Sequence, residues 1–177
     1  MKRVFLMFAF VGLLATAQAQ TWQPTSSAIG FKIKMLGLTV NGAFKGLAAT
    51  LRFEPQNLEI SNLTATVDAA TLDTENNLRN RHLREKEEFF DVAKYPKITM
   101  KSTKIEKTAT GYVGYFDLTM KATTKSVKIP FTFTQTGNKA VFSGNTTINR
   151  RDWSVGGGNL GLSNDVIISL TVNAQTQ

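Results

Sequence analysis

Apolar and polar residues alternate with a period of two through most of the chain, and this pattern predicts β-strands. In residues 28–35, for example, Phe31 and Ile33 fall on one side and Lys32 and Lys34 on the other, as in a strand with one wet face. About eight such runs, separated by turn residues, predict an all-β antiparallel sheet that closes into a barrel or folds as a sandwich. The first run continues across Gly42 to Phe44, and the other runs lie at 47–54, 63–67, 98–100, 112–120, 127–134, 142–148 and 166–172.

Residues 71–96 break this alternation and have the spacing of short helices instead. Thr74 is predicted to cap a helix N-terminus, because its hydroxyl can accept a hydrogen bond from a backbone amide of the first turn. Glu75 would then lie in that turn, where the helix dipole favours a negative charge. Pro96 lacks an amide hydrogen and disfavours a helical conformation at Tyr95, so the segment must end before it. The sequence therefore predicts a short helical insertion in an all-β domain.

The apolar side of the predicted strands is rich in phenylalanine, which bears on how the interior is filled. A barrel of about eight strands can be packed by its own side chains or can keep a cavity for one small ligand. Large aromatic side chains would make the interior wide and apolar. Both interpretations stay open on the residues alone. The residues expected to face a ligand in the interior are Phe31, Ile33, Phe44, Phe53, Phe116, Phe131, Phe133 and Phe142.

The N-terminal residues have the pattern of a secretory signal peptide. A basic pair at 2–3 precedes an apolar run at 4–15, and Ala-Gln-Ala at 17–19 supplies small residues at the spacing for cleavage. The apolar run is too short to span a bilayer comfortably. We therefore expect a signal peptide over 1–19 and one barrel domain over 20–177, in the periplasm or secreted.

Charge and cysteine content narrow the classes of partner. The formal net charge is +8, and removal of the two basic residues at 2–3 leaves +6, which favours anionic partners such as phosphate headgroups or membrane surfaces. The basic residues are spread along the strands and no nucleic-acid-binding module is visible, so no nucleic acid is expected as partner. The chain has 0 cysteines, which excludes disulfides, thiolate metal sites and a lipidated cysteine.

His82 is the only histidine and therefore the only candidate imidazole base. No serine lies in the glycine pattern of a nucleophile elbow, so catalysis by a Ser/His/Asp arrangement is not expected. A metal site would combine His82 with carboxylates alone. We expect no enzymatic activity, no metal and no cofactor. His82 is predicted either to tie the helical insertion to the sheet or to donate a hydrogen bond near the mouth of a pocket.

Arg79 and Arg150 have two interpretations. The planar guanidinium group matches phosphate oxygens, so either arginine could bind the phosphate of a ligand. Either could instead form an internal ion pair, and for Arg150 the flanking Asp152 is the simplest partner. Arg79 and His82 lie three residues apart and share a helical face. If that face covers the barrel mouth, Arg79 would meet an anionic headgroup.

Several residue groups recur at the gaps of a known family signature, written as Thr, a short gap, Arg-Asp-x-His-Leu, then Phe-Phe-Asp and Tyr-Pro. Here they are Thr74, 79–83 (Arg-Asn-Arg-His-Leu), 89–91 and 95–96. The chain thereby resembles the YceI-like, lipocalin-like polyisoprenoid-binding family. Asn80 stands where the family usually has Asp, so any salt bridge of that acid is absent. Weaker matches extend the resemblance over nearly the whole mature chain, and they include 42–44, 118–120, 148–153 and 163–166.

This resemblance implies an extended, lipocalin-like antiparallel barrel whose apolar interior holds a long isoprenoid chain. It adds Trp153, in the motif at 148–153, to the candidate ligand-binding residues. We expect a protein that binds, sequesters or transports a polyisoprenoid, an isoprenoid quinone or a similar amphiphilic lipid in the cell envelope. Peripheral membrane contact and a homodimer, which is common among relatives, are further expectations. The alternative is a packed barrel that carries no lipid and acts through its surface in envelope stress or adhesion.

Overall fold

The computed structural model describes residues 18–158 and 161–176, so the predicted signal peptide lies outside the described residues as far as residue 17. Nine antiparallel strands form one sheet in the order β2-β1-β3-β4-β5-β6-β7-β8-β9, and β1 also pairs with β9. The strands are β1 (Thr21–Met35), β2 (Leu38–Phe44), β3 (Ala48–Arg52), β4 (Asn62–Asp68), β5 (Lys97–Thr108), β6 (Gly111–Met120), β7 (Thr123–Thr136), β8 (Lys139–Asn149) and β9 (Leu162–Thr176).

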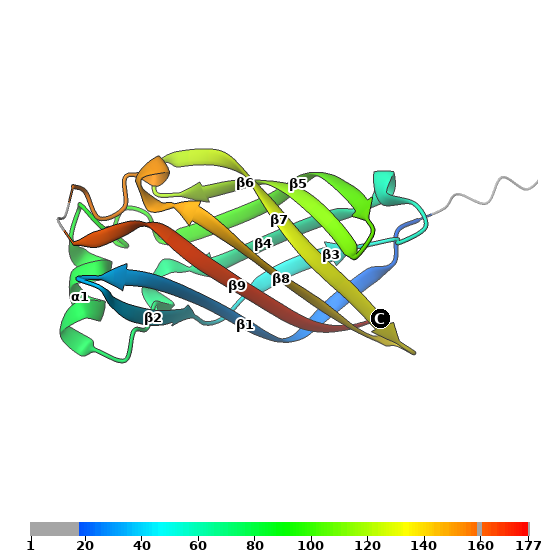
Figure 1. Ribbon diagram of the computed structural model, residues 1–177. Coiled ribbons are helices and arrows are strands. Elements are labelled where there is room, and N and C mark those ends of the chain that lie inside the picture. The colour runs from blue at the N-terminus through cyan, green and yellow to red at the C-terminus, as the bar shows by residue number, and fades with distance from the viewer. Residues whose placement is uncertain (1–17, 159–160, 177) are drawn as a thin grey trace, which may run out of the picture.

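The pairing of β1 with β9 along nearly its whole length closes the sheet into an elongated barrel (Figure 1). On its other edge, the C-terminal part of β1 pairs with β2 and its N-terminal part pairs with β3. The pairs Ile29↔Phe44 and Trp22↔Leu51 keep a single register. β2 and β3 are therefore two segments of one strand position, and eight positions close the barrel. The prediction of an extended antiparallel barrel of about eight strands is confirmed.

Helical segments lie between the strands and at one end of the barrel. They are η1 (Leu58–Ile60), η2 (Ala69–Thr71), α1 (Asn77–Glu85) and η3 (Arg150–Trp153). Figure 1 shows α1 at the end of the barrel where β1 turns into β2. An isolated bridge, Ala43↔Asp73, ties the segment before α1 to β2. In the described part of the chain, no helix has the length and apolar character to cross a membrane.

The predicted N-cap at Thr74 is wrong, because the helix begins two residues later. Asn76 is the N-cap, and its side chain accepts a hydrogen bond from the amide of Arg79 at 2.9 Å. The hydroxyl of the buried Thr74 instead donates to Oδ1 of Asn80 at 2.6 Å. Thr74 and Asn76 are both of a residue type that can cap a helix. The hydrogen bond of Thr74 to Asn80 explains why Asn76 takes this role.

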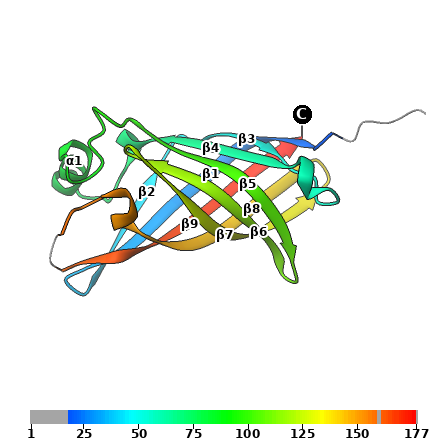
Figure 2. The same ribbon diagram turned by 90° about the horizontal axis from the view of Figure 1, so that it is seen from above.

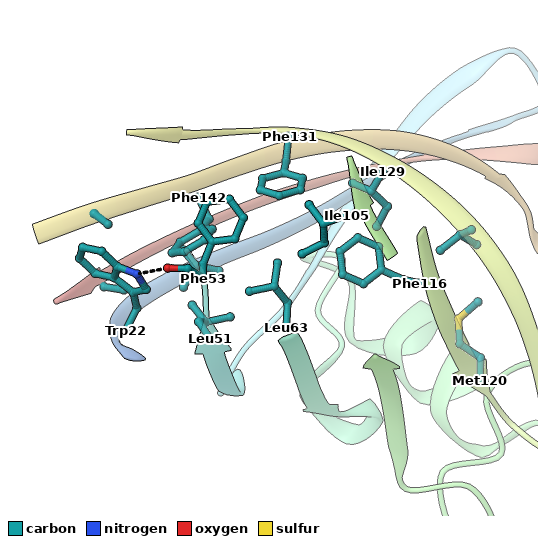
Figure 3. Packing of buried hydrophobic residues seen from close by; sticks show 14 of the residues in the cluster. Trp22, Leu51, Phe53, Leu63, Ile105, Phe116, Met120, Ile129, Phe131 and Phe142 are labelled. Atoms are coloured by element: carbon teal, nitrogen blue, oxygen red, sulfur yellow. Dashed lines mark hydrogen bonds between the residues drawn. The ribbon is translucent and has the colours of Figure 1, made fainter. Parts of the chain in front are cut away.

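Aromatic side chains fill the half of the barrel that lies away from α1. Phe53 is fully buried and packs mostly edge to face, with ring centroids 4.8–5.8 Å apart. Its partners are Tyr112, Phe131, Phe133 and Phe142. Trp22 closes this cluster, and its indole Nε1 donates to the carbonyl of Phe53 at 3.3 Å (Figure 3). Offset and edge-to-face aromatic pairs add to the stability gained from burial alone, so this half forms the rigid base of the barrel.

Candidate functional site

The end of the barrel that carries α1 is hollow. A cavity of about 470 Å³ lies between the inner faces of the strands and the inner side of α1. Phe31, Ile33 and Met35 of β1 alternate into it, as do Val40 and Phe44 of β2. Further apolar lining comes from α1, the segment after it, β6, β8, the loop after η3, and β9, through Leu78, Leu83, Phe89, Phe90, Met120, Ile148, Val155, Leu162, Val166 and Ile168.

A second, smaller chamber of about 110 Å³ lies deeper in the barrel. Both chambers share apolar lining residues, which therefore form the boundary between them. Phe31 and Phe44 are part of this boundary, with ring centroids 5.8 Å apart, and Phe44 packs edge to face on Phe90 at 5.9 Å. The Phe31 ring lies over Gly42, where a Cβ would come within 2.1 Å of the ring. The shared residues are Phe31, Phe44, Met120, Ile148 and Ile168.

The twelve residues predicted as ligand-binding divide into two groups in the structure. One group lines the larger cavity, and it consists of Phe31, Ile33, Phe44, Arg79, His82 and Arg150. The other group lines neither chamber but packs in or against the core, and it consists of Phe53, Phe116, Phe131, Phe133, Phe142 and Trp153. Trp153 is 1% exposed, and its indole donates to the carbonyl of Leu118 at 3.0 Å. Alternation predicts which side chains point inward, but not how far along the barrel they lie.

Several lining residues were missed as site residues although the sequence carries a signal for them. Ile148, Val166 and Ile168 lie on the predicted apolar side of their strands, and Phe89 and Phe90 lie in the family signature. What they share is proximity to the helical insertion. For Ile148, Val166 and Ile168 this proximity arises from long-range strand pairing, so alternation shows that they point inward but not that they line the cavity.

Arg150 organises the wall of the cavity between η3 and β9. Its side chain is buried, at 4% exposure, and donates from all three nitrogens. Nη1 bonds the carbonyls of Val155 at 2.6 Å and Gly157 at 3.0 Å, and Nε bonds that of Ser163 at 2.8 Å. Nη2 contacts the carbonyl of Leu162 and Oδ1 of Asn164, both at 3.3 Å. Burial, and then repulsion from Arg151, lowers the pKa of this guanidinium. The predicted pairing with Asp152 is wrong, because neutral oxygens surround the group.

Arg79 is held against the N-terminal side of α1 by Thr74. Its Nε donates to the hydroxyl of Thr74 at 2.8 Å, and its Nη2 donates to the carbonyl of the same residue at 2.7 Å. Within residues 18–158 and 161–176 no arginine forms an ion pair, and the ion pairs there are Lys45–Asp73, Lys97–Asp68 and Lys104–Glu106. Arg79 and Arg150 therefore line the cavity without a carboxylate partner among the described residues.

His82 lines the same cavity, and the residue is exposed. Its carbonyl accepts the amide of Lys86 at the end of α1, and its imidazole makes no hydrogen bond to another described residue. Neither predicted role of His82, to tie the insertion to the sheet or to donate near the mouth of a pocket, is carried by a side-chain hydrogen bond to a described residue, and both stay predictions. The imidazole lies at the mouth of the cavity.

The fold and the cavity together define a lipocalin-like barrel with an apolar internal chamber. A family model described as YceI-like domain matches residues 21–174. The chain therefore belongs to the YceI-like family. A UPF0312 protein of Yersinia enterocolitica is 29% identical over 157 residues, which are 85% of this chain and 81% of that protein.

Solved structures agree with this assignment. The crystal structure of BcnA of Burkholderia cenocepacia is 27% identical and superposes with a TM-score of 0.78, covering 84% of this chain and 96% of that one. A polyisoprenoid binding domain from Saccharophagus degradans superposes with a TM-score of 0.69 at 14% identity, covering 91% of this chain and 100% of that one. At that identity the second likeness concerns the fold alone.

Proposed function

We propose that this protein binds an apolar isoprenoid-type lipid, a polyisoprenoid or an isoprenoid quinone, and sequesters or transports it in the cell envelope. The observation that carries the proposal is the cavity of about 470 Å³ at the α1 end of the barrel. Its volume lies in the range of sites for small molecules and cofactors, roughly 300–1,000 Å³. The envelope location follows from the signal peptide expected at residues 1–19.

The distribution of polar groups favours an amphiphile that enters tail first. The inner chamber and its boundary are lined almost entirely by apolar side chains, and a polar ligand would lose its hydrogen bonds to water there without replacement. Polar side chains occur in the larger cavity, and most of them belong to α1 and the residues just before it: Thr74, Asn76, Arg79 and His82. A long apolar chain therefore fits the interior, with its polar end near α1.

Arg79 is the best candidate to contact the headgroup. Arg150 uses all of its nitrogens on protein oxygens, whereas Arg79 bonds Thr74 through Nε and Nη2 and has Nη1 left over among the described contacts. A charged hydrogen bond to phosphate that is shielded from water is worth about 1.5–3 kcal/mol. The headgroup contact is therefore expected to distinguish a phosphorylated isoprenoid from its neutral alcohol.

Native mass spectrometry of protein purified under mild conditions tests the proposal. We expect a co-purifying lipid, or a mass shift on adding an isoprenoid. A clean protein mass that stays unchanged with added isoprenoids would favour the alternative, a barrel that acts through its surface.

Isothermal titration with a matched pair of ligands, an isoprenyl phosphate and its alcohol, tests the headgroup contact. Arg79→Ala is expected to weaken binding of the phosphate by about 1.5–3 kcal/mol more than binding of the alcohol. Arg81→Ala is the matched control, because Arg81 lies on the same helix, is exposed and does not line the cavity. Equal losses for both ligands would mean that Arg79 is structural and that the headgroup lies elsewhere.

A further inference from the structure

Large apolar side chains are exposed around the mouth of the cavity. Leu36 is 78% exposed and Leu38 is 74% exposed, both at the turn between β1 and β2. Met35 beside them is 37% exposed, and Leu78 on α1 is 55% exposed. Figure 2 shows this turn and α1 on two sides of the same end of the barrel. We call these four residues the apolar rim. Only Val141 and Ile167 are comparably exposed elsewhere in the described chain.

The backbone conformation at the turn is unfavourable for a leucine. Leu36 has φ +51° and Gly37 has φ +81°, as in the two-residue hairpin turns that favour Asn-Gly. A branched side chain at positive φ is strained, and such strain is commonly retained for function rather than stability. The Leu36 amide donates to the carbonyl of Gly161 at 2.7 Å and holds the turn in place. The side chain leans over Gly161 but remains mostly exposed, so its burial in the protein does not explain it.

The apolar rim continues the lining of the cavity without a break. The cross-strand pairs Met35↔Leu38 and Ile33↔Val40 follow each other from the turn inward. Met35, Ile33 and Val40 line the larger cavity, and Leu38 shares the alternation of Val40 but is exposed and lies outside that lining. An apolar track therefore leads from the exposed turn to the interior. A lipid chain could move along this track without crossing water.

We propose that the apolar rim docks on a lipid bilayer and turns the mouth of the cavity toward it. The side chains that alternate with the track on β1 are Lys32 and Lys34, both exposed, and they can meet anionic headgroups behind the inserted leucines. β2 carries no acidic residue that would oppose this approach. A second copy of the chain is the weaker occupant, because four side chains on a protruding turn and a helix fall short of the roughly 800 Å² per partner of a stable interface.

This inference rests on the proposed function, since docking serves to exchange a lipid with the membrane. The double variant Leu36→Asn/Leu38→Thr removes both leucines, while asparagine accepts the positive φ and threonine suits a strand. Its melting temperature is expected to equal or exceed that of the parent. The matched control is Val141→Thr/Ile167→Thr, which removes the two exposed apolar side chains that lie outside the rim.

Flotation with vesicles of phosphatidylethanolamine and phosphatidylglycerol measures docking. We expect the parent and the control to float with the vesicles and the Leu36→Asn/Leu38→Thr variant to lose about tenfold or more of its binding. Equal flotation of all three proteins, or none by the parent, would overturn the proposal. So would a parent dimer that the variant alone dissociates, because the rim would then be an interface between copies.

Native mass spectrometry of the same proteins separates failure of docking from failure of lipid binding. Lipid retained by the parent that does not float would refute docking alone. Leucine-dependent flotation of a parent that retains no isoprenoid would refute the proposed function and leave the docking surface supported.

Discussion

Replacing Arg150 by methionine removes the charge at the cavity wall but keeps a long side chain in place. In the protein, this guanidinium gathers three short contacts, to the carbonyls of Val155, Gly157 and Ser163 at 2.6, 3.0 and 2.8 Å. The other two contacts are weak, because their donor–acceptor distance of 3.3 Å is longer than that of a usual N–H···O hydrogen bond. Arg150→Met therefore leaves several inward-facing carbonyls of the loop between η3 and β9 without their donor.

The magnitude follows from opposing contributions. A hydrogen bond from a charged donor contributes about 1.5–3 kcal/mol, so the two shortest bonds together contribute about 3–6 kcal/mol. Burying the guanidinium without a carboxylate partner costs part of this, as the lowered pKa of Arg150, caused first by burial, indicates. Water at the mouth can also replace the donor for some carbonyls. We expect Arg150→Met to lower the free energy of unfolding by about 2–4 kcal/mol.

Urea unfolding followed by tryptophan fluorescence measures this loss, because Trp22 and Trp153 are each 1% exposed and report both halves of the barrel. Arg151→Met is the matched control. Arg151 is exposed and carries the same charge, so its replacement should change stability by less than about 0.5 kcal/mol. If the two variants unfold at the same urea concentration, the carbonyl contacts of Arg150 contribute nothing net and its structural role is refuted.

Two further predictions concern the cavity and pH. Ile148 borders both chambers, so Ile148→Phe should place a ring in open space, abolish lipid retention in native mass spectrometry and leave thermal stability nearly unchanged. The pKa of Asp73 is lowered, first by the Glu75 amide and then by the Asn80 side chain. Its stabilisation is therefore complete above the ordinary carboxyl pKa and is lost as pH falls through the lowered value, so urea unfolding of Asp73→Asn and the parent should converge in acid but differ at neutral pH.

The sequence predicts the barrel well because the information for it is local. Inward and outward positions follow from alternation, as Phe31 and Ile33 against Lys32 and Lys34 illustrate. The same information cannot separate cavity from core. Phe31 and Phe131 both point inward on the apolar side, yet one borders the cavity and the other packs on Phe53 and Tyr112. The difference depends on position along the barrel axis, which long-range pairing sets.

The contacts of polar residues around α1 were the least predictable part. Asn76, and not the predicted Thr74, caps the helix. Thr74 instead donates both its backbone amide, at 2.8 Å, and its hydroxyl, at 2.6 Å, to Oδ1 of Asn80. The Asn80 amide nitrogen donates to Oδ1 of Asp73 at 3.0 Å. An aspartate at this position, as the family signature usually has, would lose that donor and place a second carboxylate beside Asp73. Asparagine at 80 is thus consistent with aspartate at 73.

The two halves of the barrel have different roles: the aromatic half stabilises the fold, and the hollow half carries the proposed function. The half with Trp22 and Phe53 is closed by buried aromatic rings and can hold the strands in register without help from a ligand. At the other end the strands enclose space, and polar contacts such as those of Arg79 and Arg150 hold α1 and the loop after η3 in place. Hydrogen-bonded segments with few buried apolar contacts open more readily than a packed core. Under the proposed function, local opening at α1 would therefore let a lipid pass from the apolar rim into the cavity while the aromatic half stays folded.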